Sequence, residues 1–275
     1  MSMNKQIICA VSSQRRKYLV KNRRQKIMTL VCQFSLLFIT IFLWEALARV
    51  GIIDSFIMSQ PTRILRVVTD FRNNNLLLHI GVTFFETIVG FAIGVILGNL
   101  IALALWYSGF LSKVLYPYLV VINALPKIAL GPVIIIWVGA GMQAVIVMAL
   151  AISLVVTIME MLNGFKNTDA ELIKMAKTFG AGRIQTFVKI VFPSNLPTLF
   201  NCLKINIGLS LVGVIAGEFL VSRAGLGYLI VYGGQVFQMD LVMTSVFILA
   251  VLASVLYYGI VLLESFVMKI FSHKK

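Results

Sequence analysis

Six long apolar stretches limit the folds open to this chain more than any other feature. Each can cross the roughly 30 Å hydrocarbon core of a bilayer as a helix of about 20 residues. Hydrocarbon offers a backbone amide no hydrogen-bond partner, so each stretch should be helical, and the alternation typical of barrel strands is not seen. The stretches are 28–47, 82–106, 115–137, 142–161, 199–220 and 241–267. The sequence therefore predicts an all-α membrane protein with six transmembrane helices.

The first apolar stretch follows a basic segment, residues 1–27, which holds eight Lys or Arg and no acid. A cleaved signal peptide is the alternative interpretation, because residues 46–48 read Ala-Leu-Ala. The basic segment is long for a signal peptide, however, and the apolar stretch has the length of a full span. We expect a retained helix, a basic cytoplasmic segment 1–27 and one transmembrane domain, 28–275.

The charges of the chain indicate its orientation in the membrane. Only 12% of the residues are charged, although the net charge is +14. The cations flank the apolar stretches and do not form a folded basic face, so nucleic acid is not an expected partner. An even number of spans places both termini on one side, and the positive-inside rule puts that side in the cytoplasm. The predicted location is the plasma membrane.

Catalytic and metal-binding patterns are missing from the sequence. The three cysteines are far apart, and the two histidines form no H-E-x-x-H motif. The P-loop pattern G-x-x-x-x-G-K-[ST] does not occur either. We expect no catalytic residue, no metal site and no cofactor in this chain.

The segment 164–197 is the most informative part of the chain between apolar stretches. Thr168 and Glu171 have the spacing of a capping box, which predicts a short helix that ends near Gly180. A second amphipathic stretch follows until Pro193 removes an amide. Its apolar positions are Ile184, Phe187, Val188 and Val191. We predict a helical elbow that docks on a partner; the alternative is a solvated loop.

The same segment resembles the cytoplasmic Glu-Ala-Ala motif of permease subunits of ATP-binding-cassette importers. In that motif the triplet is followed by three residues, Gly, nine residues, Ile, any residue, Leu and Pro. Four positions match, namely Ala176, Gly180, Ile190 and Pro193. Three positions differ, namely Lys174, Met175 and Phe192. A lysine cannot accept the hydrogen bonds of the motif's carboxylate, so the departure at Lys174 leaves open how the helix is held.

The resemblance covers about residues 60–270 and extends to stretches 124–132 and 224–230. It is closest to the permeases for sulfonates, taurine, nitrate and related solutes. It implies a type I importer permease whose elbow is a coupling helix. The implied partners are a second permease subunit in a homodimer, two cytoplasmic ATPase subunits that bind ATP and Mg, and an external solute-binding protein. The implied coupling residues are Thr168, Glu171, Lys174, Met175, Ala176, Gly180, Ile190 and Pro193.

Charges inside the apolar stretches are candidates for a solute pathway. A charge at mid-bilayer costs about 2.5–3.5 kcal/mol on insertion scales, so it needs a partner or water. The candidate pathway residues are Glu86, Pro126, Lys127, Glu160 and Glu218. Headgroup-seeking side chains or structural pairs are the alternative for the glutamates. Three charges near span ends are interpreted as headgroup-seeking, namely Glu45, Lys204 and Glu264.

Small and helix-breaking residues within the spans predict packing and kinks. Gly90, Gly94 and Gly98 form one smooth helix face, which favours close packing within the subunit over a dimer contact. Pro126 and Pro132 predict kinks in the third span.

Segment 51–75 has the pattern of a helix lying on the outer surface, and it would border the solute entrance together with segment 221–240.

The function expected from the resemblance is ATP-driven import of a small solute, with hydrolysis in a partner subunit. Sulfonate, taurine, nitrate and a pyrimidine or flavin precursor all remain open. The alternative is an ion-coupled secondary transporter or channel that uses the intramembrane glutamates, but such a carrier has no need of a docking elbow and often shows inverted repeats. A membrane anchor without transport explains the buried charges poorly.

Overall fold

A computed structural model describes residues 13–52, 54–69 and 75–272. Within these residues the chain forms helices and no strand, which confirms the all-α prediction. The chain divides into two compact units, Met1–Arg66 and Val67–Lys275. Each unit is described by itself.

The first unit is built on one long helix, α2 (Ser13–Val50), followed by the short α3 (Ser55–Met58). Helix α4 (Pro61–Thr69) crosses the boundary between the units. Glu45 of α2 accepts hydrogen bonds from Arg49 Nε at 2.8 Å and from the backbone amide of Thr62 at 3.2 Å. Protein groups therefore hold Glu45, and its position at the headgroup level stays a prediction. Helix α2 runs through position 27 without a break, and the domain boundary there stays a prediction.

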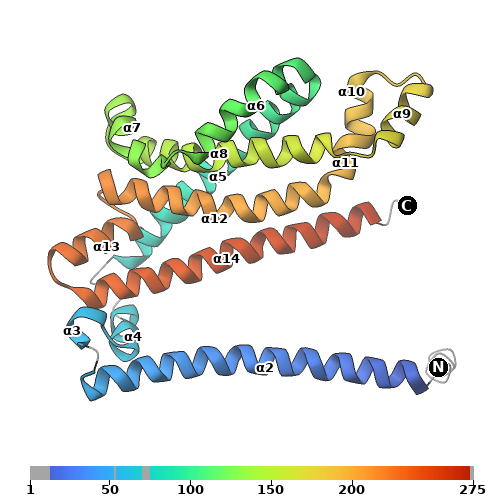
Figure 1. Ribbon diagram of the computed structural model, residues 1–275. Coiled ribbons are helices and arrows are strands. Elements are labelled where there is room, and N and C mark those ends of the chain that lie inside the picture. Colours follow the sequence, from blue (N-terminus) through green and yellow to red (C-terminus); the bar gives the residue numbers. More distant parts are fainter. Residues whose placement is uncertain (1–12, 53, 70–74, 273–275) are drawn as a thin grey trace. The chain divides into compact units, whose positions relative to one another are not determined.

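The second unit contains four long helices: α5 (Leu76–Tyr107), α8 (Met142–Lys166), α12 (Leu196–Val221) and α14 (Met239–Ser272). Each is long and apolar enough to span a membrane, as is the part of α2 from Val20 to Val50. Figure 1 shows α8 and α12 side by side along most of their length. Five of the six predicted stretches fall within these helices, which extend beyond them at both ends except that α8 begins where its stretch does, at Met142.

The predicted third span is broken into two parts. Helix α6 (Gly109–Ala124) ends before Pro126, and η1 (Lys127–Leu130) and α7 (Gly131–Val138) follow at an angle of 86°. The interruption expected at Pro126 is confirmed, because the span bends there, just before η1. The second expected kink is wrong, because Pro132 lies in the first turn of α7, where its missing amide costs no hydrogen bond. The described residues hold five candidate spans, or six if this bent pair counts as one.

Glycines bring the backbones of α5 and α12 against α8. A Cβ on Gly90 or Gly94 would lie 2.8 Å from Ala149 Cβ or Ser153 Oγ of α8. A Cβ on Gly213 of α12 would lie 2.5 Å from the Cα of Ala149. The prediction that the glycine ladder packs within the subunit is confirmed, and α8 is held between two glycine-bearing helices.

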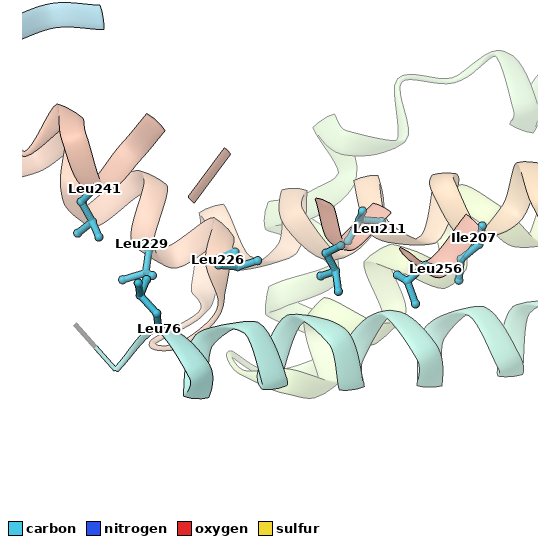
Figure 2. Close-up of a cluster of buried hydrophobic side chains, with 8 residues drawn as sticks. Leu76, Ile207, Leu211, Leu226, Leu229, Leu241 and Leu256 are labelled. Atoms are coloured by element: carbon cyan, nitrogen blue, oxygen red, sulfur yellow. The ribbon is translucent and has the colours of Figure 1, made fainter. Parts of the chain in front are cut away.

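A leucine cluster holds α13 (Leu226–Gln235) against the long helices. Figure 2 shows Leu226 and Leu229 of α13 beside Leu76, the first residue of α5. The complete buried set is Leu76, Ile207, Leu211, Leu226, Leu229, Leu241, Leu252 and Leu256. Helix α13 is therefore part of the bundle core.

An ion pair joins α12 to α14. Lys204 Nζ lies 2.6 Å from Glu264 Oε2, and both side chains are about one fifth exposed. Each of these two charges therefore has the other as a partner, and their position at the headgroup level stays a prediction.

Candidate functional site

The segment between α8 and α12 forms the predicted helical elbow, which we define as residues 167–195 (Figure 1). Its first helix is α9 (Ala170–Thr178), capped by Asp169, whose side chain accepts a hydrogen bond from the Glu171 amide at 2.8 Å. The prediction of Thr168 as the cap is wrong by one position, so the capping-box spacing to Glu171 is not met. Thr168 is buried, and its Oγ1 accepts a hydrogen bond from Asn195 Nδ2 at 2.8 Å. This bond ties the two ends of the elbow together.

Gly180 ends α9 as the sequence predicts. Its φ is +74°, in the left-handed region that only glycine enters at little cost. The Ala181 amide donates to the Ala176 carbonyl at 3.0 Å, and the Gly180 amide donates to the Lys177 carbonyl at 2.9 Å. These two bonds form a Schellman cap, so the chain leaves α9 in a fixed direction.

The second half of the elbow is helical but irregular. It consists of α10 (Arg183–Thr186), the π-helix η2 (Phe187–Val191) and α11 (Phe192–Ser194). Pro193 has no amide to donate, and the Phe192 amide donates to Phe187, five residues back. The helix was expected to stop at Pro193, and it continues one residue further.

The elbow carries an exposed apolar face. Phe179 is 84% exposed, and the other exposed large apolar side chains are Leu172, Met175, Ile184, Val188 and Phe192. Ala176 and Val191 are buried against the rest of the elbow and the bundle, and Ile190 is half-buried. Lys174 and Glu171 are exposed. Exposed apolar side chains together with exposed charges are typical of a surface that another protein covers.

Glu218 lies at the centre of a buried polar network at the opposite end of α12. Its side chain is 1% exposed. Oε1 accepts a hydrogen bond from Thr83 Oγ1 at 2.6 Å, and Oε2 accepts one from the Gly227 amide at 2.5 Å. Thr83 Oγ1 in turn accepts from the Leu226 amide at 2.8 Å, and His79 Nδ1 accepts from the Gly225 amide at 2.9 Å.

This network satisfies the first amides of α13 with side chains from α5 and α12. The first four amides of a helix have no intrahelical partner, so acceptors there stabilise the helix start. Gly225 has a φ of +115°, and a Cβ on it would collide with the Glu218 carboxyl group. Sequence reasoning missed the roles of Thr83 and His79; the glycines of stretch 224–230 were the only signal of a close approach.

Glu86 is the second buried carboxyl group in this region. It is 1% exposed and lies close to Glu218. The Oε2 atom of Glu86 has no hydrogen-bond partner within the described part of the chain. The structure thus brings together two of the five candidate pathway residues.

The other three candidates lie apart from this network. Lys127 follows the break between α6 and η1, where its Nζ donates to Asn123 Oδ1 at 3.0 Å, and Pro126 stands next to it. Glu160 is exposed near the end of α8. Whether these residues line a pathway stays a prediction. Across the described ranges, no three His, Cys, Asp or Glu side chains are placed to bind a metal.

Comparison with known proteins connects this architecture to a family. The sequence model of the family described as "binding-protein-dependent transport system inner membrane component" matches residues 90–273. A probable ABC transporter permease protein of Haemophilus influenzae is 30% identical over 223 residues, which cover 81% of this chain and 90% of that protein. The formylaminopyrimidine transport permease protein ThiX of Halalkalibacterium halodurans is 27% identical over 186 residues, covering 68% and 74%.

A solved structure shares the fold. The chain superimposes on inward-facing MetNI methionine ABC transporter with a TM-score of 0.63 and 20% identity. The match covers 69% of this chain and 94% of the other.

Proposed function

The chain belongs to the family of binding-protein-dependent transport system inner membrane components, and on that premise we propose that it moves a small solute into the cell with energy from separate ATPase subunits. It is a multi-pass inner-membrane permease subunit of an ABC importer, and such subunits are not themselves enzymes. The proposal goes beyond family membership in three respects: the source of energy, the partner proteins and the class of solute.

The exposed apolar face of the elbow is the observation that carries this proposal. Phe179 and Met175 project from a helix that is capped at both ends and joined to two spanning helices. A rod of this kind can transmit the movement of an ATPase subunit to α8 and α12 together. Nucleotide binding would then shift the bundle between inward-open and outward-open states.

The proposed assembly has two permease subunits, two cytoplasmic ATPase subunits that hold ATP and Mg, and an external solute-binding protein. The termini and the elbow face the cytoplasm in this assembly. The solute is a small molecule of the sulfonate, taurine, nitrate or pyrimidine and flavin-precursor classes. The similarity to a formylaminopyrimidine permease supports the pyrimidine class.

Charged substitutions on the exposed face of the elbow test this proposal. Phe179→Asp combined with Met175→Asp should weaken retention of the partner ATPase on the order of tenfold, because central apolar contacts dominate such interfaces. Solute-stimulated ATP turnover in proteoliposomes should fall in parallel. The measurements are co-purification of the ATPase and phosphate release.

Ile270→Asp is the matched control, because Ile270 is an exposed apolar residue near the end of α14 and outside the elbow. It should leave ATPase retention unchanged. Solute uptake by the permease alone, without any ATPase subunit, would contradict the proposal and favour an ion-coupled carrier.

A further inference from the structure

A cavity of about 220 Å³ lies between the elbow and the junction of α5 with α6. Trp106 and Tyr107 at the end of α5 form one side of it, and the elbow forms the other. The lining residues are Trp106, Tyr107, Gly109, Ile173, Lys177, Ala181, Arg183 and Thr186. The lining thus includes two cations and no acidic side chain.

Arg183 is held in place by protein groups while most of its donors stay free. Its Nη1 donates to the Tyr107 carbonyl at 3.3 Å, and its guanidinium carbon lies 5.6 Å from the centre of the Tyr107 ring. A guanidinium has five N–H donors, and Arg183 uses one of them among the residues that the structure describes, which leaves four for a ligand. This fixed orientation lowers the entropy that Arg183 loses when it binds an anion.

Lys177 supplies the second cation. No hydrogen bond or ion pair of its ammonium is found with the residues that the structure describes. Lys177 lies in the last turn of α9 and Arg183 in the first turn of α10, on either side of the Gly180 cap. The two cations therefore converge on one cavity from separate helices.

The depth of the cavity favours a ligand from the membrane surface. The candidate span of α5 ends at Tyr107, so this residue and Trp106 mark the level where spanning helices meet the headgroups. The Trp106 ring lies 5.2 Å from the Phe187 ring, centre to centre, and both partly buried rings pack against a buried apolar cluster. The cavity thus has aromatic side chains on the α5 side and two cations on the elbow side.

We propose that this cavity binds the phosphate of an anionic phospholipid headgroup. Basic pockets at the headgroup level of helix bundles suit the single negative charge of a phosphate diester, and the guanidinium fork suits its oxygens. The bound phosphate bridges Lys177 of α9 and Arg183 of α10, whose guanidinium also contacts α5. A phosphate bound in this cavity therefore stabilises the contact between the elbow and the bundle. This inference does not depend on the ATPase or on the transported solute.

Lipid retention by the purified full-length chain tests the proposal. The chain is extracted from vesicles of phosphatidylcholine with phosphatidylglycerol, and bound lipid is counted by native mass spectrometry. Lys177→Gln with Arg183→Gln should lower phosphatidylglycerol retention on the order of tenfold, because each cation near a membrane surface contributes about 1 kcal/mol. Lys177→Arg with Arg183→Lys keeps both charges and should keep most of the lipid.

Lys113→Gln with Lys189→Gln is the matched control, since it removes two exposed cations that do not line the cavity. It should retain the lipid. Inorganic phosphate is the second probe. If it stabilises the wild-type chain but not the double variant of Lys177 and Arg183, and the wild type shows no preference for phosphatidylglycerol, the lipid source is overturned. The cavity is then assigned to a soluble anion. Equal phosphatidylglycerol retention by the wild type and that variant overturns the site itself.

Discussion

At the residue scale, Glu218 of α12 caps the start of α13, the helix that begins eight residues later in the sequence. Both of its oxygens accept hydrogen bonds, from Thr83 and from the Gly227 amide. A buried carboxyl group is tolerated where such donors replace water. Glu218 therefore has a structural role whether or not it also borders a solute pathway, and a test must separate the two.

Replacement of Glu218 by Gln should destabilise the chain. One carboxylate oxygen becomes an NH₂ group, which cannot accept the hydrogen bond of the donor that faces it. The buried donor is left unsatisfied, which lowers the free energy of unfolding by about 1–3 kcal/mol. The thermal unfolding temperature of the purified chain should fall by several degrees, and solute uptake should fall with it. Differential scanning fluorimetry and proteoliposome uptake measure the two effects.

Glu160→Gln is the control for stability, because Glu160 is an exposed carboxylate in a span of the same bundle. Its unfolding temperature should match the wild type. An unchanged unfolding temperature in Glu218→Gln, together with lost uptake, would contradict the capping role and place Glu218 in the pathway.

At the element scale, the direction of the elbow depends on the backbone at Gly180. The Schellman cap sets the angle between α9 and α10, and no side chain near Gly180 would block a larger residue. Any effect of a substitution there comes from the left-handed backbone, and not from a steric clash.

Gly180→Val should reduce solute-stimulated ATP turnover of the reconstituted complex. Valine in the left-handed region costs about 1–2 kcal/mol, so the elbow relaxes to another direction. Gly182→Ser is the control, because Gly182 has an extended backbone at φ −65° and ψ 166° and serine is a good helix N-cap. The same turnover in Gly180→Val as in the wild type would mean that the cap geometry does not contribute to coupling.

The sequence predicts the elements of this protein better than their junctions. The length of each apolar stretch locates a span, because in lipid every backbone amide of a span must be hydrogen-bonded within its own helix. Pro126 signals a break in the helix but not its 86° angle, which depends on packing after the chain folds. Asp169 and Thr168 are neighbours that can both cap a helix, and the bond from Asn195 to Thr168 decides between them.

The polar network around Glu218 could not be predicted for a different reason. Thr83 and Glu218 are 135 positions apart, and His79 and Gly225 are 146 apart. Neither threonine nor histidine has a pattern along α5 that indicates such a contact. The glycine ladder was predictable because its spacing alone creates a smooth face.

At the scale of the whole molecule, the elbow is connected to a tightly packed group of helices. Helix α8 enters the elbow, α12 leaves it, and glycines on α5 and α12 leave no room for a Cβ against α8. Close-packed interfaces of this kind move as units, because small shifts cannot be absorbed locally. A displacement of the elbow should therefore move α5, α8 and α12 together.

Transmission of movement from a cytoplasmic ATPase through the elbow requires the elbow and the loop after α13 to face opposite sides of the membrane. Helix α12 alone separates the elbow from α13, so the two ends of one span carry them. Phe179 in the elbow and Phe237 after α13 are both exposed and suit labelling. From the positive-inside rule we expect Phe179 in the cytoplasm, because cations are concentrated in the elbow.

Cysteine labelling tests this orientation. With Cys9, Cys32 and Cys202 replaced by Ser and the chain expressed without its partners, Phe237→Cys should react with a membrane-impermeant maleimide in intact cells. Phe179→Cys should react only in inside-out vesicles, since the elbow then faces the reagent. Denatured samples of both variants should react fully, which shows that each thiol is available. Reaction of Phe179→Cys in intact cells would reverse the topology, and the elbow would then lie on the side without nucleotide and could not receive energy from an ATPase.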